Sequence, residues 1–156
     1  MSVVECIHTS DRFVIIRVGD IVCINVYFPC SGTKDRSLLY SELLNDVWSW
    51  RSKYTECGCV IGGDFNIDLD LTSGVSKHVN KFIHNNSFLR CDVLFPSTVN
   101  YTYINESLNH SSKIDYFLCN AIKVCNFEIF EHNVNLSDHL PLLLSCTVHI
   151  AKSNAY

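Results

Sequence analysis

Hydrophobic and polar positions alternate with two different periods along the chain, and the change of period divides the chain into elements. Two runs rich in β-branched residues, 13–18 and 21–28, flank the pair Gly19-Asp20. This arrangement is typical of a β-hairpin with a two-residue turn. Pro29 to Thr33 is rich in turn-forming residues, so a loop is predicted to follow the hairpin.

The period becomes helical between about residues 35 and 54. Apolar residues recur there at a spacing of three or four positions, and they are Leu39, Leu43, Leu44, Val47, Trp48 and Trp50. This spacing predicts an amphipathic helix packed on a sheet. The two tryptophans are expected in the core or at its rim.

The remaining pattern predicts a second helix and several further strands. Cys59 to Ile61 reads as a short buried strand before Gly62-Gly63, and Val75 to His84 as a helix. Later strand-like runs are Tyr101–Ile104, Ile114–Cys119, Val124–Phe130 and Leu142–His149. This order predicts an α/β domain whose second half is a mixed or antiparallel sheet.

Composition and charge narrow the class of protein. With 156 residues and 47% hydrophobic content, residues 1–156 are expected to form a single domain with a substantial core. The net charge of −4 does not provide the basic face of a tight nucleic-acid binder, and it favours a divalent-metal site. No apolar run is long enough to cross a membrane, so no membrane partner is expected.

The cysteines favour a reducing environment. There are nine of them, an odd number without paired CxxC spacing, which indicates neither a disulfide framework nor a zinc cage. We therefore expect an intracellular protein, nuclear or cytoplasmic.

Asp64 and Asn66 are the first candidates for chemistry. They follow Gly62-Gly63 at the end of the predicted strand, and side chains two residues apart on a strand share one face. A carboxylate there can orient or deprotonate water, and an amide can donate to a phosphoryl oxygen. The glycines would permit a tight turn and close approach of a ligand. The alternative is an ordinary turn after a strand.

Asp115 and the pair Asp138-His139 are the second group of candidates. Asp115 lies inside an apolar strand, where a carboxylate is costly unless it is paired, and His139 is the obvious partner. Asp138 beside His139 suits a metal ligand next to a proton-handling group. The alternatives are a polar turn for Asp138-His139 and a solvent-facing edge position for Asp115.

The order of the motifs is more specific than any one motif. The chain contains in sequence Tyr27-Phe28-Pro29, Gly63-Asp64-Phe65-Asn66, Thr102-Tyr103, Ile114-Asp115-Tyr116 and Ser137-Asp138-His139. In this order and rough spacing, the chain from about Arg12 to His149 resembles the endonuclease/exonuclease/phosphatase superfamily. Within that superfamily it looks most like the apurinic-type endonuclease domains of non-LTR retrotransposons. Tyr27 taken alone would be an ordinary core residue.

The resemblance implies a fold, a cofactor and a reaction. The implied fold is a two-sheet sandwich flanked by helices, the four-layer DNase-like α/β fold, with the site at the common end of the sheets. The implied cofactor is Mg²⁺ or Mn²⁺, and the implied reaction is hydrolysis of a phosphodiester, with DNA as substrate, or of a phosphomonoester.

The same resemblance assigns roles to individual residues. It implies that Asp64 activates water, that Asn66 helps to hold that water and the phosphate, and that Tyr27 contacts the phosphate or leaving group. His139, supported by Asp115, would donate to the phosphoryl oxygen. The metal would be held by Asp138, Asp64 and Asn66.

Two departures from the family pattern leave other interpretations open. The Asn-bearing and Glu-bearing strands that the family carries before the hairpin have no counterpart after Met1, so we expect an N-terminally incomplete domain with weak activity. The residue before Ile114 is Lys113 where the family commonly has Arg. A truncated pseudoenzyme that self-associates through exposed sheet edges is one alternative, and a phosphatase of the same fold is another.

Overall fold

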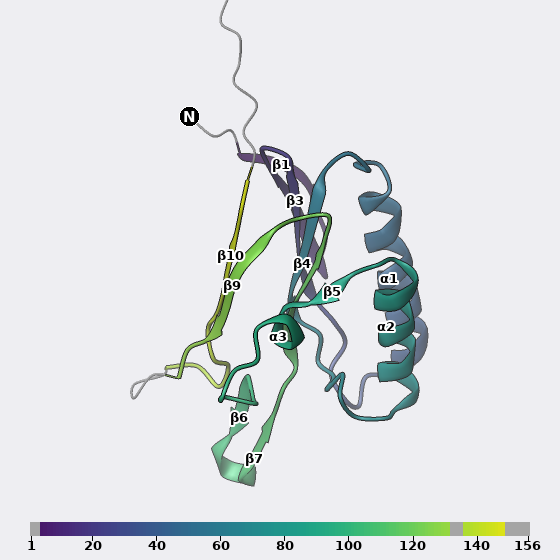
Figure 1. Cartoon of the computed structure of the whole chain (residues 1–156). Helices are drawn as coiled ribbons and strands as arrows, with labels where there is room; N and C mark the ends of the chain where they lie inside the picture. The colour runs from purple at the N-terminus through teal and green to yellow at the C-terminus, as the bar shows by residue number, and fades with distance from the viewer. Residues whose placement is uncertain (1–3, 132–135, 149–156) are drawn as a thin grey trace, which may run out of the picture.

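The computed structural model describes residues 4–131 and 136–148. Helices and strands alternate along this part of the chain (Figure 1). In chain order they are β1 (Val4–Thr9), β2 (Phe13–Val18), β3 (Ile21–Tyr27), α1 (Arg36–Arg51), β4 (Gly58–Asp64), α2 (Gly74–Asn85), β5 (Leu89–Arg90), α3 (Cys91–Leu94), β6 (Tyr103–Asn105), the 3-10 helix η1 (Glu106–Leu108), β7 (His110–Ser112), β8 (Asp115–Asn120), β9 (Val124–Ile129) and β10 (Leu142–Cys146). No helix within these residues is long and apolar enough to span a membrane.

A six-stranded sheet forms the centre of the domain, in the order β1-β2-β3-β4-β8-β5. The predicted hairpin is formed by β2 and β3, in which Val18 lies opposite Ile21 across the two-residue turn. β3 and β4 are parallel, which requires a crossover, and α1 supplies it. β8 then inserts antiparallel between β4 and β5.

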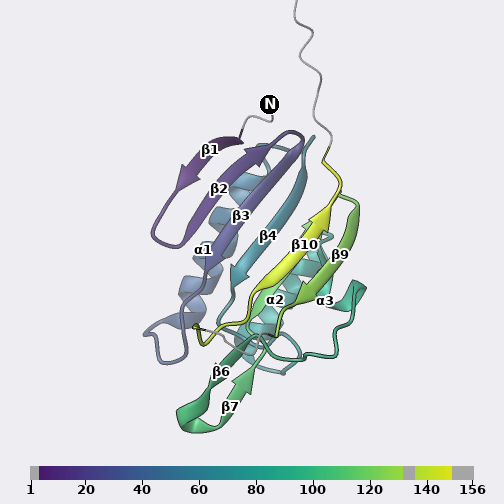
Figure 2. The ribbon, with the colours of Figure 1, turned by 90° about the vertical axis from the view of Figure 1, so that its left-hand side faces the viewer.

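The sheet separates a layer of helices from a smaller layer of strands. α1 and α2 cover one face, and the antiparallel pair β9–β10 lies over the other (Figures 1 and 2). The ring of Phe117 on β8 packs edge-on against Phe127 on β9, with ring centroids 6.3 Å apart. The predicted α/β class, with two packed sheets and flanking helices, is confirmed.

The face of α1 that is buried overlaps the predicted stripe at Leu44 and Val47 but is centred differently. Its buried residues are Tyr40, Leu44, Val47 and Arg51, so the helix is rotated away from Leu39, which is only half-buried. The reason is that the fold satisfies the polar ends of two of these side chains: the Tyr40 hydroxyl donates to the carbonyl of Phe65 (2.5 Å), and the Arg51 guanidinium donates to that of Cys57 (2.9 Å). A hydrophobicity pattern cannot anticipate such partners.

The two tryptophans lie at the rim of the core, as expected. Trp50 is half-buried and stacks on His8, with ring centroids 4.6 Å apart. Trp48 is 40% exposed and meets the edge of Phe82.

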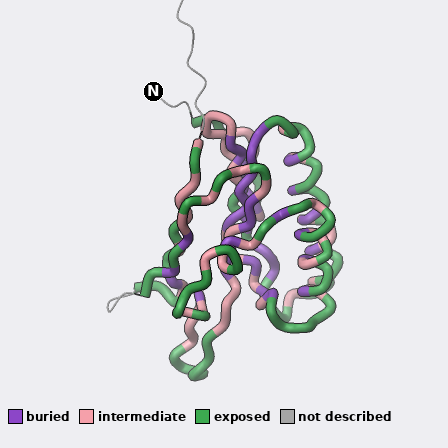
Figure 3. The backbone as a smooth tube through the Cα atoms, viewed as in Figure 1, coloured by how far each residue is buried: buried purple, intermediate pink, exposed green. Residues whose placement is uncertain are grey.

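Burial is concentrated in the middle of the central sheet and the helix faces above it (Figure 3). Among the described strands, β1 and β10 each end a sheet, and Val4 and Val14 near the β1 edge remain 59% and 37% exposed. The expected self-association through such edges stays a prediction.

Candidate active site

Three strands, β3, β4 and β8, bring Tyr27, Asp64 and Asp115 to one end of the central sheet. In the sheet register Tyr27 lies opposite Asp64, and Asp64 lies opposite Asp115. On β4 the buried side chains of Cys59 and Ile61 point to the helical layer. Because side chains alternate along a strand, Asp64 must therefore project from the opposite face.

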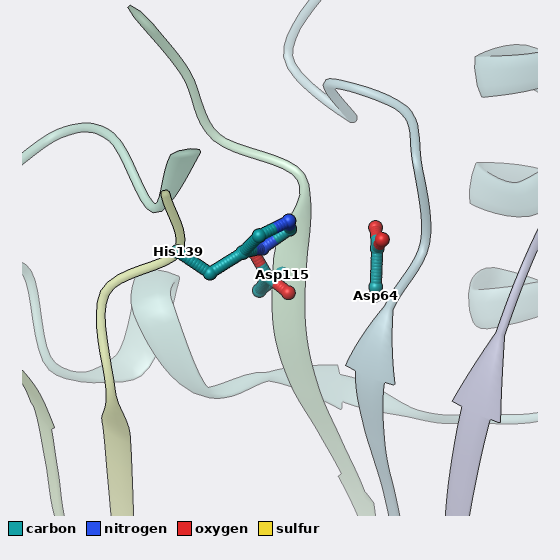
Figure 4. A group of neighbouring side chains, drawn as sticks. All are labelled: Asp64, Asp115 and His139. Atoms are coloured by element: carbon teal, nitrogen blue, oxygen red, sulfur yellow. The ribbon is translucent and has the colours of Figure 1, made fainter. Parts of the chain in front are cut away.

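Asp115 has the partner that its position in an apolar strand requires. It is 8% exposed, and its Oδ2 lies 2.8 Å from Nδ1 of His139 (Figure 4). His139 is fixed in turn by a backbone bridge to Tyr103, whose ring centroid lies 5.1 Å from that of the imidazole. A carboxylate at Nδ1 orients the imidazole and favours one of its tautomers.

Thr102 is a supporting residue to which the sequence assigned no role. It is fully buried, and its hydroxyl oxygen accepts hydrogen bonds from the backbone N–H groups of Ile114 and Asp115, both at 3.0 Å. These bonds fix the start of β8 and so the position of the Asp115 carboxylate. Its sequence signal was its position between Tyr101 and Tyr103. The resemblance included this motif but assigned it no function.

Asn66 holds the Asp64 carboxylate in place. The backbone N–H of Asn66 donates to Oδ1 of Asp64 (2.7 Å), and its side-chain amide donates to Oδ2 (2.9 Å) and to the carbonyl of Phe28 (2.9 Å). Asn66 has a left-handed backbone (φ 51°), which Asn tolerates better than most residues. The two amide hydrogens thus point to groups of the chain itself.

Arg36 fixes the same loop, and sequence reasoning missed it. Its guanidinium donates to the carbonyls of Pro29 (3.1 Å) and Asn66 (2.6 Å). A cation in the first turn of a predicted helix carries no sequence signal for such a contact.

Burial dominates the electrostatics of the two aspartates. It raises the pKa of Asp64 to about 6, with the negative charge of Asp115 adding to the effect and the N–H of Asn66 opposing it. Burial likewise raises the pKa of Asp115, against the hydrogen bonds from Thr102 and His139. Two desolvated carboxylates that repel each other are a site that a cation stabilises.

The donors also fit a divalent cation geometrically. Ligand atoms of Asp64, Asp115 and His139 all lie within 4.8 Å of one another, and the three side chains converge from three segments (Figure 4). Mg²⁺ is commonly held by one or two carboxylates with water completing its shell. These residues therefore could hold Mg²⁺ or Mn²⁺.

Asp138 and Tyr27 lie at the margin of this group. Asp138 is exposed and lines a cavity of about 570 Å³ next to the site, yet its charge still contributes to the raised pKa of Asp115. Tyr27 is 49% exposed, and the guanidinium carbon of Arg12 lies 5.4 Å from the centre of its ring.

Lys113 belongs to an ion network beside the site. Its Nζ lies 2.7 Å from Asp70 and 3.0 Å from Asp92, and Arg90 contacts the same two acids at 2.8 and 2.6 Å. Arg90 supplies a two-pronged contact to Asp92, so this network contains a guanidinium fork although Lys113 cannot provide one.

Gly62 and Gly63 serve the packing of the sheet. A Cβ on Gly62 would lie 2.4 Å from the ring of Phe117, and one on Gly63 would lie 2.1 Å from the carbonyl oxygen of Val26. Gly63 also has φ +133°, which other residues rarely adopt. The sequence predicted a close approach of a ligand to these glycines, but here neighbouring strands of the chain make that approach.

Comparison with known proteins identifies the fold. No protein-family model matches the chain, and no curated protein does. Among solved structures it is similar to a 3'-5' exonuclease from Neisseria meningitidis, with a TM-score of 0.76 and 18% identity over 93% of this chain and 72% of that one. It is also similar to an AP endonuclease from Archaeoglobus fulgidus, with a TM-score of 0.69 and 16% identity over 94% and 72%.

A third similar structure is a mannosyl-6-phosphatase from Bacteroides thetaiotaomicron, with a TM-score of 0.63 and 16% identity over 86% of this chain and 55% of that one. At these identities the similarity establishes the architecture, so the chain has the DNase-like fold shared by these nuclease and phosphatase structures.

Proposed function

We propose that this chain carries the active site of a metal-dependent phosphodiester hydrolase acting on DNA, of the apurinic endonuclease type found in non-LTR retrotransposons. The observation that carries the proposal is the convergence of Asp64, Asp115 and His139 within 4.8 Å at one end of a DNase-like fold. The exonuclease and the AP endonuclease with similar structures support a nucleic-acid substrate.

The proposed reaction is displacement at phosphorus by water. The Asp64 carboxylate, with a pKa of about 6, is mostly ionised at neutral pH and accepts a proton from the attacking water. The water oxygen bonds to phosphorus while the bond to the leaving sugar oxygen breaks, and that oxygen takes a proton from surrounding water. His139, oriented by Asp115, donates a hydrogen bond to the phosphoryl oxygen as its charge grows.

The other residues of the site assist this step. Asn66 holds Asp64 in its orientation, and Tyr27, exposed at the same end of the sheet, contacts the phosphate or the leaving group. Mg²⁺ or Mn²⁺ would be held by the carboxylates of Asp64 and Asp115, with Asp138 close by, and would neutralise the charge that develops on the phosphoryl oxygens.

A phosphatase acting on a small phosphoester is the second candidate. The similarity to a mannosyl-6-phosphatase favours it, and so does the net charge of −4, which does not draw a polyanion to the surface. A shared fold does not choose between these substrates.

The test compares nicking of supercoiled plasmid with release of phosphate from p-nitrophenyl phosphate, each in Mg²⁺, in Mn²⁺ and in EDTA. We expect weak, metal-dependent nicking whose rate falls on the order of a hundredfold or more in His139→Ala. His84→Ala is the matched control, because His84 is exposed on α2 in the helical layer. Phosphate release without nicking would favour the phosphatase, and inactivity on both substrates would favour a pseudoenzyme.

A further inference from the structure

Arg12 extends the row of site residues by one strand. The backbone N–H of Tyr27 donates to the carbonyl of Arg12 (2.8 Å), so Arg12 lies beside Tyr27 just as Tyr27 lies beside Asp64 and Asp64 beside Asp115. The guanidinium carbon lies 5.4 Å from the centre of the exposed Tyr27 ring. A cation and an aromatic ring therefore stand together at the side of the acidic site.

Arg12 differs from other cations at this end of the sheet in its contacts. Lys113 and Arg90 are held by Asp70 and Asp92, and Arg36 donates to two backbone carbonyls. Within residues 4–131 and 136–148, no carboxylate lies within ion-pair distance of Arg12. Its charge is therefore available to an anionic ligand, in a chain whose net charge is −4.

The spacing of the row indicates which anion Arg12 can contact. Neighbouring strands lie about 4.8 Å apart, which puts the backbone of Arg12 about 10 Å from that of Asp64, with Tyr27 between them. A nucleic-acid strand carries a charge at every nucleotide, about 3.4 Å apart along a duplex axis. A strand with its scissile phosphate at Asp64 thus brings another of its phosphates toward Arg12.

The chemistry of the pair suits such a phosphate. A guanidinium over an aromatic ring keeps its N–H edges directed outward, and these edges match phosphate oxygens in a two-pronged contact. The Tyr27 ring restricts the side chain and so lowers the entropy lost when the phosphate binds.

We propose that Arg12, positioned by Tyr27, binds a phosphate that neighbours the scissile one and thereby makes the site selective for nucleic-acid strands over small phosphoesters. This inference rests on the proposed function, because it assumes that hydrolysis occurs at Asp64. It names a specificity-determining residue that lies outside the acidic group.

The binding experiment measures the affinity of the chain for a fluorescein-labelled single-stranded DNA 12-mer by anisotropy, over a series of salt concentrations. Loss of one phosphate contact should reduce the slope of log K against log salt by about 0.7, as for single strands. We expect this reduction in Arg12→Gln and retention of the slope in Arg12→Lys, which keeps the charge. Lys53→Gln is the matched control, since Lys53 also lies over an aromatic ring, that of Trp50, at 3.6 Å.

The kinetic experiment compares kcat/KM for the 12-mer with kcat/KM for bis-p-nitrophenyl phosphate, a diester with no second phosphate. In Arg12→Gln the ratio of the two values should fall on the order of tenfold, mainly through KM for the 12-mer. An equal loss on both substrates would overturn the proposal, because Arg12 would then support the site as a whole and not the choice of substrate.

The two hypotheses fail differently. If the wild-type chain hydrolyses neither substrate, the proposed function fails, and the salt slopes still decide whether Arg12 binds a phosphate. If hydrolysis is metal-dependent but neither the ratio nor the slope changes in Arg12→Gln, the role of Arg12 is refuted and the proposed function stands.

Discussion

Removing the imidazole of His139 should destabilise the domain through the carboxylate that it leaves behind. Asp115 is 8% exposed, and His139 Nδ1 lies 2.8 Å from its Oδ2. Breaking a fully buried charged pair costs about 3–5 kcal/mol. The imidazole side chain is 32% exposed, so water can partly replace it, and Thr102 still hydrogen-bonds the carboxylate. We therefore expect His139→Ala to lower the free energy of unfolding by about 1–2 kcal/mol.

A double-mutant cycle separates this loss from the loss of packing. Asp115→Asn removes the charge and keeps the shape, so in that background His139→Ala should cost less, by roughly 1 kcal/mol of coupling. Urea unfolding followed by tryptophan fluorescence measures the effect, because Trp48 and Trp50 both lie on α1. With a slope of about 2 kcal/mol per molar urea, His139→Ala should lower the midpoint by about 0.5–1 M. A coupling below about 0.3 kcal/mol would refute the reasoning, since the two groups would then be independent.

Three further predictions concern the framework of the site. Val47→Asp should unfold the domain, because Val47 is 1% exposed and a buried unpaired charge is among the costliest changes. The control is Leu38→Asp on the same helix, at a residue 59% exposed, which should leave the thermal unfolding midpoint within a few degrees of that of the wild-type chain. Gly63→Ala should destabilise by at least about 1–3 kcal/mol through backbone strain, measurable by urea unfolding, and a neutral result would contradict the steric clash with Val26. Hydrogen bonds, first from Arg90, lower the pKa of Asp70 from 3.8 to about 2. The ion pairs of Asp70 should therefore stabilise the fold above pH 3.8, and this stability should be lost as the pH falls toward 2. Asp70→Asn should flatten the dependence of the free energy of unfolding on pH in that window, and an unchanged dependence would contradict the pairing.

The parts of the fold that depend on local pattern were predictable from the sequence. The Gly19-Asp20 turn fixed the register of the first hairpin, since a two-residue turn leaves little choice. The pairing of Asp115 with His139 was also predictable, because the cost of burying a lone carboxylate requires a partner. In both cases the local free-energy cost of the alternative is larger than the rest of the structure can offset.

The parts that depend on distant partners were not predictable. β1 was missed because its residues are mostly exposed, and its pairing with β2 defines it rather than an apolar run of its own. β5 consists of two residues that only β8 makes into a strand. On the buried face of α1, Leu44 and Val47 were predicted, but Tyr40 and Arg51 were not. Both look polar until the carbonyls that accept their hydrogen bonds are known.

The insertion of β8 between β4 and β5 also sets the order in which the molecule can assemble. Pairings between segments far apart in sequence form slowly, because the intervening chain must be closed into a loop first. During synthesis, the segments of β1 to β4 and α1 are made before that of β8, so Asp64 is present in the chain ahead of Asp115 and His139. A nascent chain at that stage has one carboxylate of the group and an open strand edge. The three donors can therefore come together only after residue 139 has been made.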